Sequence, residues 1–166
     1  STMLSELRLS NVFDFLKIIP QELVQNLVQE FQKLHHQFFL GHWESSQLDG
    51  GRFGEAVLRY IEYKNTGNFT PIGSQLARIA IINSTAQNTN LDRSLRITIP
   101  SLAGLIMDFR NGRNVAHLGV IDVNEMDSIF VVQAVNWIMA EIVRIEAQTS
   151  PEEAQIPIVL DRLKEL

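Results

Sequence analysis

The chain has 166 residues, of which 45% are hydrophobic, a share that allows one folded domain with a sizeable core. It contains no cysteine, which excludes disulfides, thiolate catalysis and cysteine-based zinc or iron–sulfur sites. A formal net charge of -5 disfavours a protein that binds duplex DNA over a broad basic surface. We expect a cytoplasmic protein with no membrane contact, because no secretion signal opens the chain and no apolar run approaches the ~20 residues that cross a bilayer.

The apolar pattern divides the chain into one main domain with two flanking segments. Residues 1–19 predict an arm or short helix, and within them residues 1–3 resemble an expression-tag remnant. Residues 20–147 form the expected helical domain. Residues 148–166 predict a helical extension that begins at Ser150-Pro151, and whether they open a further domain is left open.

The first half of this domain predicts three helices. The first spans about 20 to 43, begins at Pro20 and carries an apolar stripe at spacings of three and four. The run Gln47 to Gly51 predicts a turn, because Asp and paired glycines favour one. A second helix then runs to about Lys64, with Gly67 just beyond it, and a third spans about 72 to 82 before an exposed polar connection at 83–90.

The second half predicts two more helices. Thr98-Ile99-Pro100 is typical of a helix start, and the apolar positions that follow extend the fourth helix to about Phe109. Asp122 and Glu125 have the spacing of a capping box for the fifth helix, which we expect to be the most buried, with Trp137 in the core. The predicted fold class is therefore all-α, a helical bundle of about five main helices.

Between the last two helices lies the stretch FRNGRNVAHLG, residues 109–119, which gathers five polar side chains at a turn. They are Arg110, Asn111, Arg113, Asn114 and His117. Cations at a helix C-terminus are favoured by the helix dipole alone, which explains the arginines without any function. That explanation does not account for the asparagines and the histidine beside them.

The pattern resembles the HEPN superfamily, whose motif is an arginine, commonly followed by a polar residue, and then a histidine after four to six intervening residues. Arg110-Asn111 and His117 match it with six residues between Arg110 and His117, whereas Arg113 lies too close to His117. Trp43-Glu44 and the segment Gly51-Arg52-Phe53-x-Glu55 are also similar to bacterial HEPN-like proteins. The resemblance covers roughly residues 20 to 147.

The resemblance implies a dimeric, metal-independent endoribonuclease in a bacterial stress, toxin–antitoxin or phage-defence setting, with no cofactor. Arg110 would bind the phosphate, His117 would move the proton and Asn111 would orient them, because a guanidinium matches phosphate oxygens and an imidazole titrates near neutral pH. Two copies of the motif would share one cleft, lined by four further residues that bind the substrate: Arg93, Arg96, Arg113 and Asn114. A protein partner such as an antitoxin is also open.

Two alternatives stand beside this hypothesis. The chain could be a non-catalytic module that dimerises and binds nucleotide, RNA or protein, or a structural bundle in which the motif arose by chance. His35 and His42 share a helix face, but no carboxylate completes a metal site with them, so a structural or surface role is expected. Phe38, Phe39 and Trp43 predict either an aromatic interface or part of the core.

Overall fold

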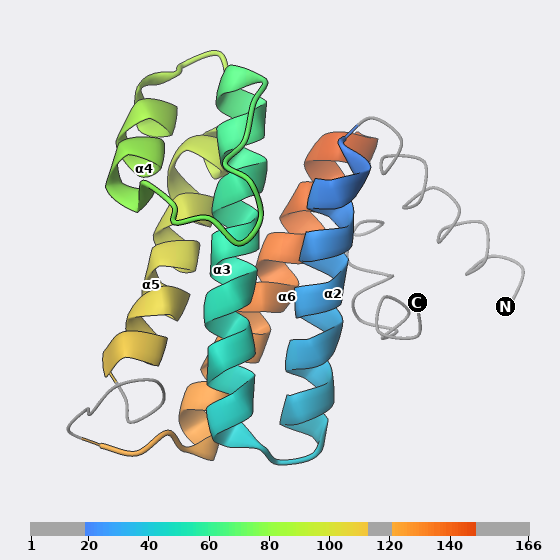
Figure 1. Cartoon of the computed structure of the whole chain (residues 1–166), viewed down its shortest axis with the longest axis vertical. Helices are drawn as coiled ribbons and strands as arrows, with labels where there is room; N and C mark the ends of the chain where they lie inside the picture. Colours follow the sequence, from blue (N-terminus) through green and yellow to red (C-terminus); the bar gives the residue numbers. More distant parts are fainter. Residues whose placement is uncertain (1–18, 113–120, 149–166) are drawn as a thin grey trace, which may run out of the picture.

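A computed structural model of the chain describes residues 19–112 and 121–148. Their elements are α2 (Gln21–Phe39), α3 (Trp43–Thr66), α4 (Arg78–Gln87), the π-helical turn η1 (Ser94–Thr98), α5 (Ile99–Gly112) and α6 (Glu125–Ala147). These helices lie side by side in a bundle (Figure 1). The all-α prediction is confirmed, while the predictions for the arm and for the C-terminal extension fall on residues outside the described ranges.

Helix α2 follows the predicted stripe. Its buried face carries Leu23, Leu27, Phe31 and Leu34, and the hydrophobic effect holds that face against the rest of the bundle. The helix ends at Phe39 rather than near 43, because Gly41 adopts a positive φ of 74° and turns the chain into α3. A side chain at Gly41 would be strained by that backbone conformation.

Helix α3 is the central element, since it packs against α2, α4, α5 and α6. The predicted turn at Gln47 to Gly51 is wrong: these residues lie within the 24-residue helix, and Gly50, Gly51 and Gly54 face its neighbours. Their missing side chains let other helices approach closely, and this packing outweighs the low helix propensity of glycine. The predicted end is confirmed, as Gly67 caps the helix with a φ of 81°.

Helix α4 begins six residues later than the predicted third helix and covers much of the run expected as a connection. The preceding loop is held on α3 by Arg59, which is 4% exposed and donates from Nε to the Thr70 carbonyl (3.1 Å) and from Nη2 to that of Ser74 (2.8 Å). Because buried charge needs such partners, this tether fixes the loop in a non-helical path. The apolar residues near 72 therefore lie in the loop, outside the helix.

The fourth predicted helix starts at Ile99, as expected, but Thr98 does not cap it. The backbone N–H of Ile99 bonds to Ser94, five residues back, so a wide π-turn precedes α5, and Thr98 lies inside it rather than capping the helix. Pro100 follows directly and has no N–H to give to the regular ladder. The π-turn occurs where the proline interrupts the α-helical hydrogen bonds.

Helix α6 differs from its prediction at its start and in its burial. The cap is Asn124, whose side chain accepts a hydrogen bond from the Asp127 N–H (3.0 Å), so the predicted box at Asp122 and Glu125 is wrong. Trp137 is 40% exposed and therefore lies only partly in the core. By length and composition α6 is apolar enough to span a membrane, contrary to our expectation of no such run, and half of that window is buried inside the bundle.

Candidate functional site

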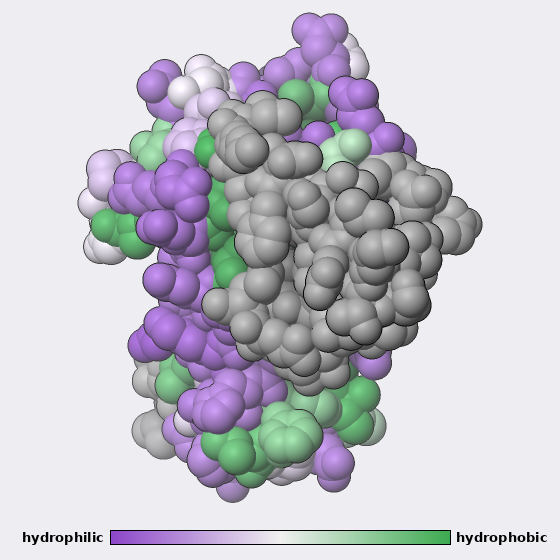
Figure 2. Space-filling view, turned by 90° about the vertical axis from the view of Figure 1, so that its right-hand side faces the viewer, coloured by the Kyte–Doolittle hydropathy of each residue, from purple (hydrophilic) through white to green (hydrophobic). Residues whose placement is uncertain are grey.

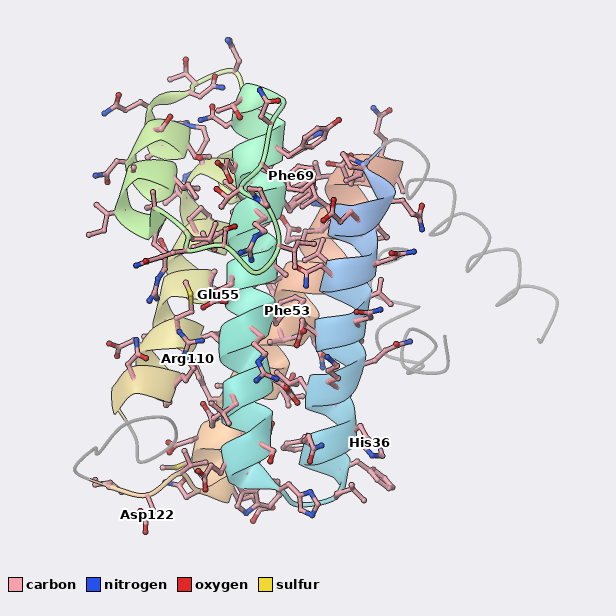
Figure 3. All side chains as sticks on the ribbon, viewed as in Figure 1. His36, Phe53, Glu55, Phe69, Arg110 and Asp122 are labelled. Atoms are coloured by element: carbon pink, nitrogen blue, oxygen red, sulfur yellow. The ribbon has the colours of Figure 1, made fainter. Side chains whose placement is uncertain are left out.

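Arg110 lies in the last turn of α5, followed by the exposed residues Asn111 and Gly112. Its guanidinium Nη1 donates to Glu55 Oε1 on α3 at 3.3 Å. The two labelled side chains lie in the space where α3 and α5 run together (Figure 3). The end of α5 is therefore joined to the middle of α3 by one charged contact.

Helix α3 has no side chain at Gly51, and this leaves room for Arg110. A Cβ atom added to Gly51 would lie 2.5 Å from Cδ, 2.8 Å from Nε and 2.7 Å from Nη1 of Arg110. Gly51 and Glu55 are four residues apart, so they occupy one face of α3. The glycine lets the arginine lie flat on the helix, and the glutamate receives its end.

The ion pair is better suited to orienting Arg110 than to stabilising the fold. The Arg110 side chain is 14% exposed and that of Glu55 is 34% exposed, so water screens part of their attraction. Among the described residues, Glu55 is the hydrogen-bond partner of the Arg110 guanidinium. A planar donor group held in this way presents a fixed orientation to an incoming anion.

The structure does not bring Arg93 and Arg96 to Arg110 within one chain. Arg96 precedes Arg110 by fourteen helical residues, which is about 21 Å along the axis at the usual rise. Its Nε and Nη2 both donate to the Ala86 carbonyl at the end of α4, at 3.2 and 2.9 Å. Arg93 is exposed, and its Nη1 donates to Thr98 Oγ1 at 3.4 Å.

Three predicted site residues, Arg113, Asn114 and His117, lie outside the described residues. That they lie near Arg110 therefore stays a prediction. The resemblance includes Gly51 and Glu55 but gives them no role in the site. The signal that could have found them is helical spacing, because Gly51 and Glu55 fall on the same face only when the Gln47 to Gly51 run is helical.

His35 of α2 and His42, which precedes α3, have different surroundings. His35 Nε2 hydrogen-bonds to Asn136 Oδ1 of α6 at 2.7 Å inside the bundle, whereas His42 Nδ1 contacts Gln37 Oε1 at 2.8 Å on the surface. No group of three potential ligands is found among the residues that the structure describes. His35 is 7% exposed and has the structural role expected for it.

A second concentration of charge lies along the contact between α2 and α3. Glu30 and Asp49 are each 7% exposed, and burial raises the pKa of both carboxyl groups, with Asp49 raising that of Glu30 further. Lys33 and Arg52 lie at their outer edge, at 3.5 Å from Glu30 and Asp49 respectively, and oppose the shift. This pair is closed off by its own helices, and we assign it to the pH dependence of folding.

Compared with protein-family models, curated proteins and solved structures, the chain gives no match in any of the three.

Proposed function

We propose that this protein is a dimeric, metal-independent endoribonuclease of HEPN type that acts in the cytoplasm, in a bacterial stress or phage-defence setting. The position of Arg110 is the observation that most supports the proposal. Its side chain lies against Gly51, and its Nη1 is 3.3 Å from Glu55 Oε1. This arrangement fixes a phosphate-binding group at the end of the helix that leads into the segment bearing His117.

The proposed reaction uses the 2'-hydroxyl of the RNA as the nucleophile. His117 accepts its proton as the oxygen attacks phosphorus, and Arg110 stabilises the charge on the non-bridging oxygens. The bond from phosphorus to the 5'-oxygen breaks, and that oxygen takes up a proton from the histidine of the second copy of the motif in the dimer cleft. The products are a 2',3'-cyclic phosphate and a 5'-hydroxyl, with no metal ion required.

Glu55 is a positioning residue in this proposal, because it contacts Arg110 and not the RNA. Asn111 follows Arg110 at the exposed end of α5, where its amide is available to the phosphate or to His117. Arg113 and Asn114, which follow α5 in the sequence, would add substrate contacts. Arg93 and Arg96, which lie far from Arg110 within one chain, would contribute only if the RNA extends along α5 or if a second copy supplies them.

Exposed apolar side chains support the dimer. Met126 of α6 is 73% exposed, Ile129 is 44% exposed, and Phe39 at the end of α2 is 82% exposed. Hydrophobic side chains gather at the lower end of the face seen in Figure 2, where the α2–α3 turn lies. Exposed apolar surface of this kind marks a contact with another molecule, and a second copy would bring a second His117 to the site.

The same apolar surface and the acidic net charge also favour the second candidate, a non-catalytic module that binds RNA, nucleotide or a protein partner such as an antitoxin. In that case Arg110 and Glu55 are a structural ion pair. The two candidates differ in one respect that can be measured, since only the enzyme cleaves RNA.

The test is an RNA cleavage assay with and without EDTA, using the parent and the variants His117→Ala, Arg110→Lys and Glu55→Gln. We expect cleavage that survives EDTA, a loss of about 100-fold or more with His117→Ala, and a smaller loss with Glu55→Gln that appears mainly in kcat. Arg52→Gln, at an exposed position on α3, is the matched control. A folded His117→Ala protein as active as the parent would falsify the proposal, and a parent with no activity would favour the binding module.

A further inference from the structure

An apolar groove lies between the start of α4 and the middle of α5. Its volume is about 590 Å³, within the range of pockets that hold small molecules. Leu76, Ile79 and Ile82 line one side, and Gly104 and Met107 of α5 line the other. Arg78 is the charged residue in this lining.

The groove is open because α5 carries a glycine at its centre. A Cβ atom added to Gly104 would find nothing within 4 Å, so the space above this residue is empty of protein. The opposite wall, at the start of α4, is held in place by Arg59, which binds the loop that leads into this helix. The groove is therefore preformed and does not depend on a side chain moving aside.

Arg78 gives the groove its chemical character. Its Nη1 lies 3.4 Å from the Met107 sulfur, and a thioether is a weak acceptor. No carboxylate lies within ion-pair distance of Arg78 in the part of the chain that the structure describes. A half-buried guanidinium beside aliphatic walls favours a ligand that brings a negative charge.

We propose that this groove binds an aliphatic monocarboxylate, with its hydrocarbon chain against Ile79, Ile82 and Met107 and its carboxylate on Arg78. The walls are aliphatic and contain no aromatic ring on which a nucleobase would stack. A nucleotide would also leave several polar groups unpaired there, which costs free energy. The site is separate from the proposed ribonuclease function, because Arg110 and Glu55 are not part of the lining.

Calorimetric titration of the protein with octanoate tests the proposal, and octan-1-ol serves as the ligand without the charge. We expect saturable binding of octanoate, and binding at least tenfold weaker for octan-1-ol and for the Arg78→Met variant, the effect of losing one charge-assisted hydrogen bond. Arg52→Met removes a comparable charge from the α2–α3 contact and should bind octanoate as the parent does. Absence of saturable heat with octanoate, or equal affinity in Arg78→Met, would overturn the proposal.

A second variant fills the groove without touching its charge. Gly104→Leu places a side chain in the empty space and replaces a poor helix former by a good one, so it should melt at or above the parent temperature and lose octanoate binding at least tenfold. Gln133→Leu makes a similar addition at an exposed position of α6, outside the groove, and should leave binding unchanged. A folded Gly104→Leu protein that binds octanoate like the parent would show that the ligand lies elsewhere, against the proposal.

Discussion

At the scale of single residues, two glycines of the bundle have opposite surroundings. Gly51 lies under the Arg110 side chain, with three of its atoms within 2.8 Å of an added Cβ, whereas Gly104 faces empty space. Substitution by alanine therefore tests the contact with Arg110 at Gly51, whereas at Gly104 it tests helix propensity alone. The local sequence does not predict this difference, since it favours a turn around Gly51 and a helix around Gly104.

Gly51→Ala should displace the Arg110 guanidinium from Glu55 while leaving the fold intact. The displaced group is a flexible side chain, and alanine gains up to ~1 kcal/mol in helix propensity, so we expect the free energy of unfolding to stay within ~1 kcal/mol of the parent. RNA cleavage should fall by ~100-fold, because a misplaced catalytic group costs about that much. Urea unfolding and single-turnover cleavage measure the two effects.

Gly104→Ala is the stability control for that experiment. Its Cβ meets no atom within 4 Å, so the free energy of unfolding should rise by up to ~1 kcal/mol. Equal destabilisation of the Gly51→Ala and Gly104→Ala proteins would contradict the difference in surroundings described above.

At the scale of elements, the start of α6 depends on Asn124. Its side chain accepts from the Asp127 N–H, which would otherwise lack a partner in the first helical turn. Asn124→Ala should lower the free energy of unfolding by ~1 kcal/mol, and Asn124→Asp should restore most of it, because aspartate caps equally well. If Asn124→Ala unfolds at the same urea concentration as the parent, another group caps α6.

The contact between α2 and α3 should make stability depend on pH. The folded-state pKa of Glu30 lies above its ordinary value of 4.5 and that of Asp49 above 3.8, in both cases chiefly because burial disfavours the charged form. The folded state thus binds more protons than the unfolded state between the ordinary and the raised pKa values, and stability must fall as pH rises through that window. Below the ordinary pKa values both groups are protonated in the folded and the unfolded state, and the gain in stability is then complete.

Glu30→Gln removes one of these titrations. We expect the variant to be more stable than the parent at pH values above the raised pKa of Glu30, where the parent carries a buried charge, and this advantage to shrink as the pH falls toward 4.5. Urea unfolding of both proteins at several pH values measures it. Parallel curves for parent and variant would rule out Glu30 as a source of the pH dependence.

At the scale of the whole molecule, the apolar surface at one end of the bundle predicts self-association. Phe39→Glu and Met126→Glu, both at exposed positions, should convert a dimer into a monomer without unfolding it, because they place charge in the contact. Light scattering after size-exclusion chromatography measures the mass. Ile79→Glu, on α4 and 76% exposed, is the matched control and should remain dimeric.

The order of helices in the chain did not reveal which one is central. Helix α6 is the most apolar by sequence, yet Met126, Ile129 and Trp137 are exposed, while α3 packs against four other helices. Hydrophobicity predicts that a helix has a face to bury, and it does not predict how many partners that face meets. In α3 the glycines allow close approach, and this shape property outweighs composition.

The sequence by itself determined the all-α class, the amphipathic face of α2 and the end of α3 at Gly67, because periodicity and a glycine cap act over a few neighbouring residues. Only the tertiary structure decided that Gln47 to Gly51 is helical and that Arg110 lies on Gly51 against Glu55. Glu55 and Arg110 are 55 residues apart. The packing of α5 on α3 brings them together, and the free energy of that packing overrides the local preference of two glycines for a turn.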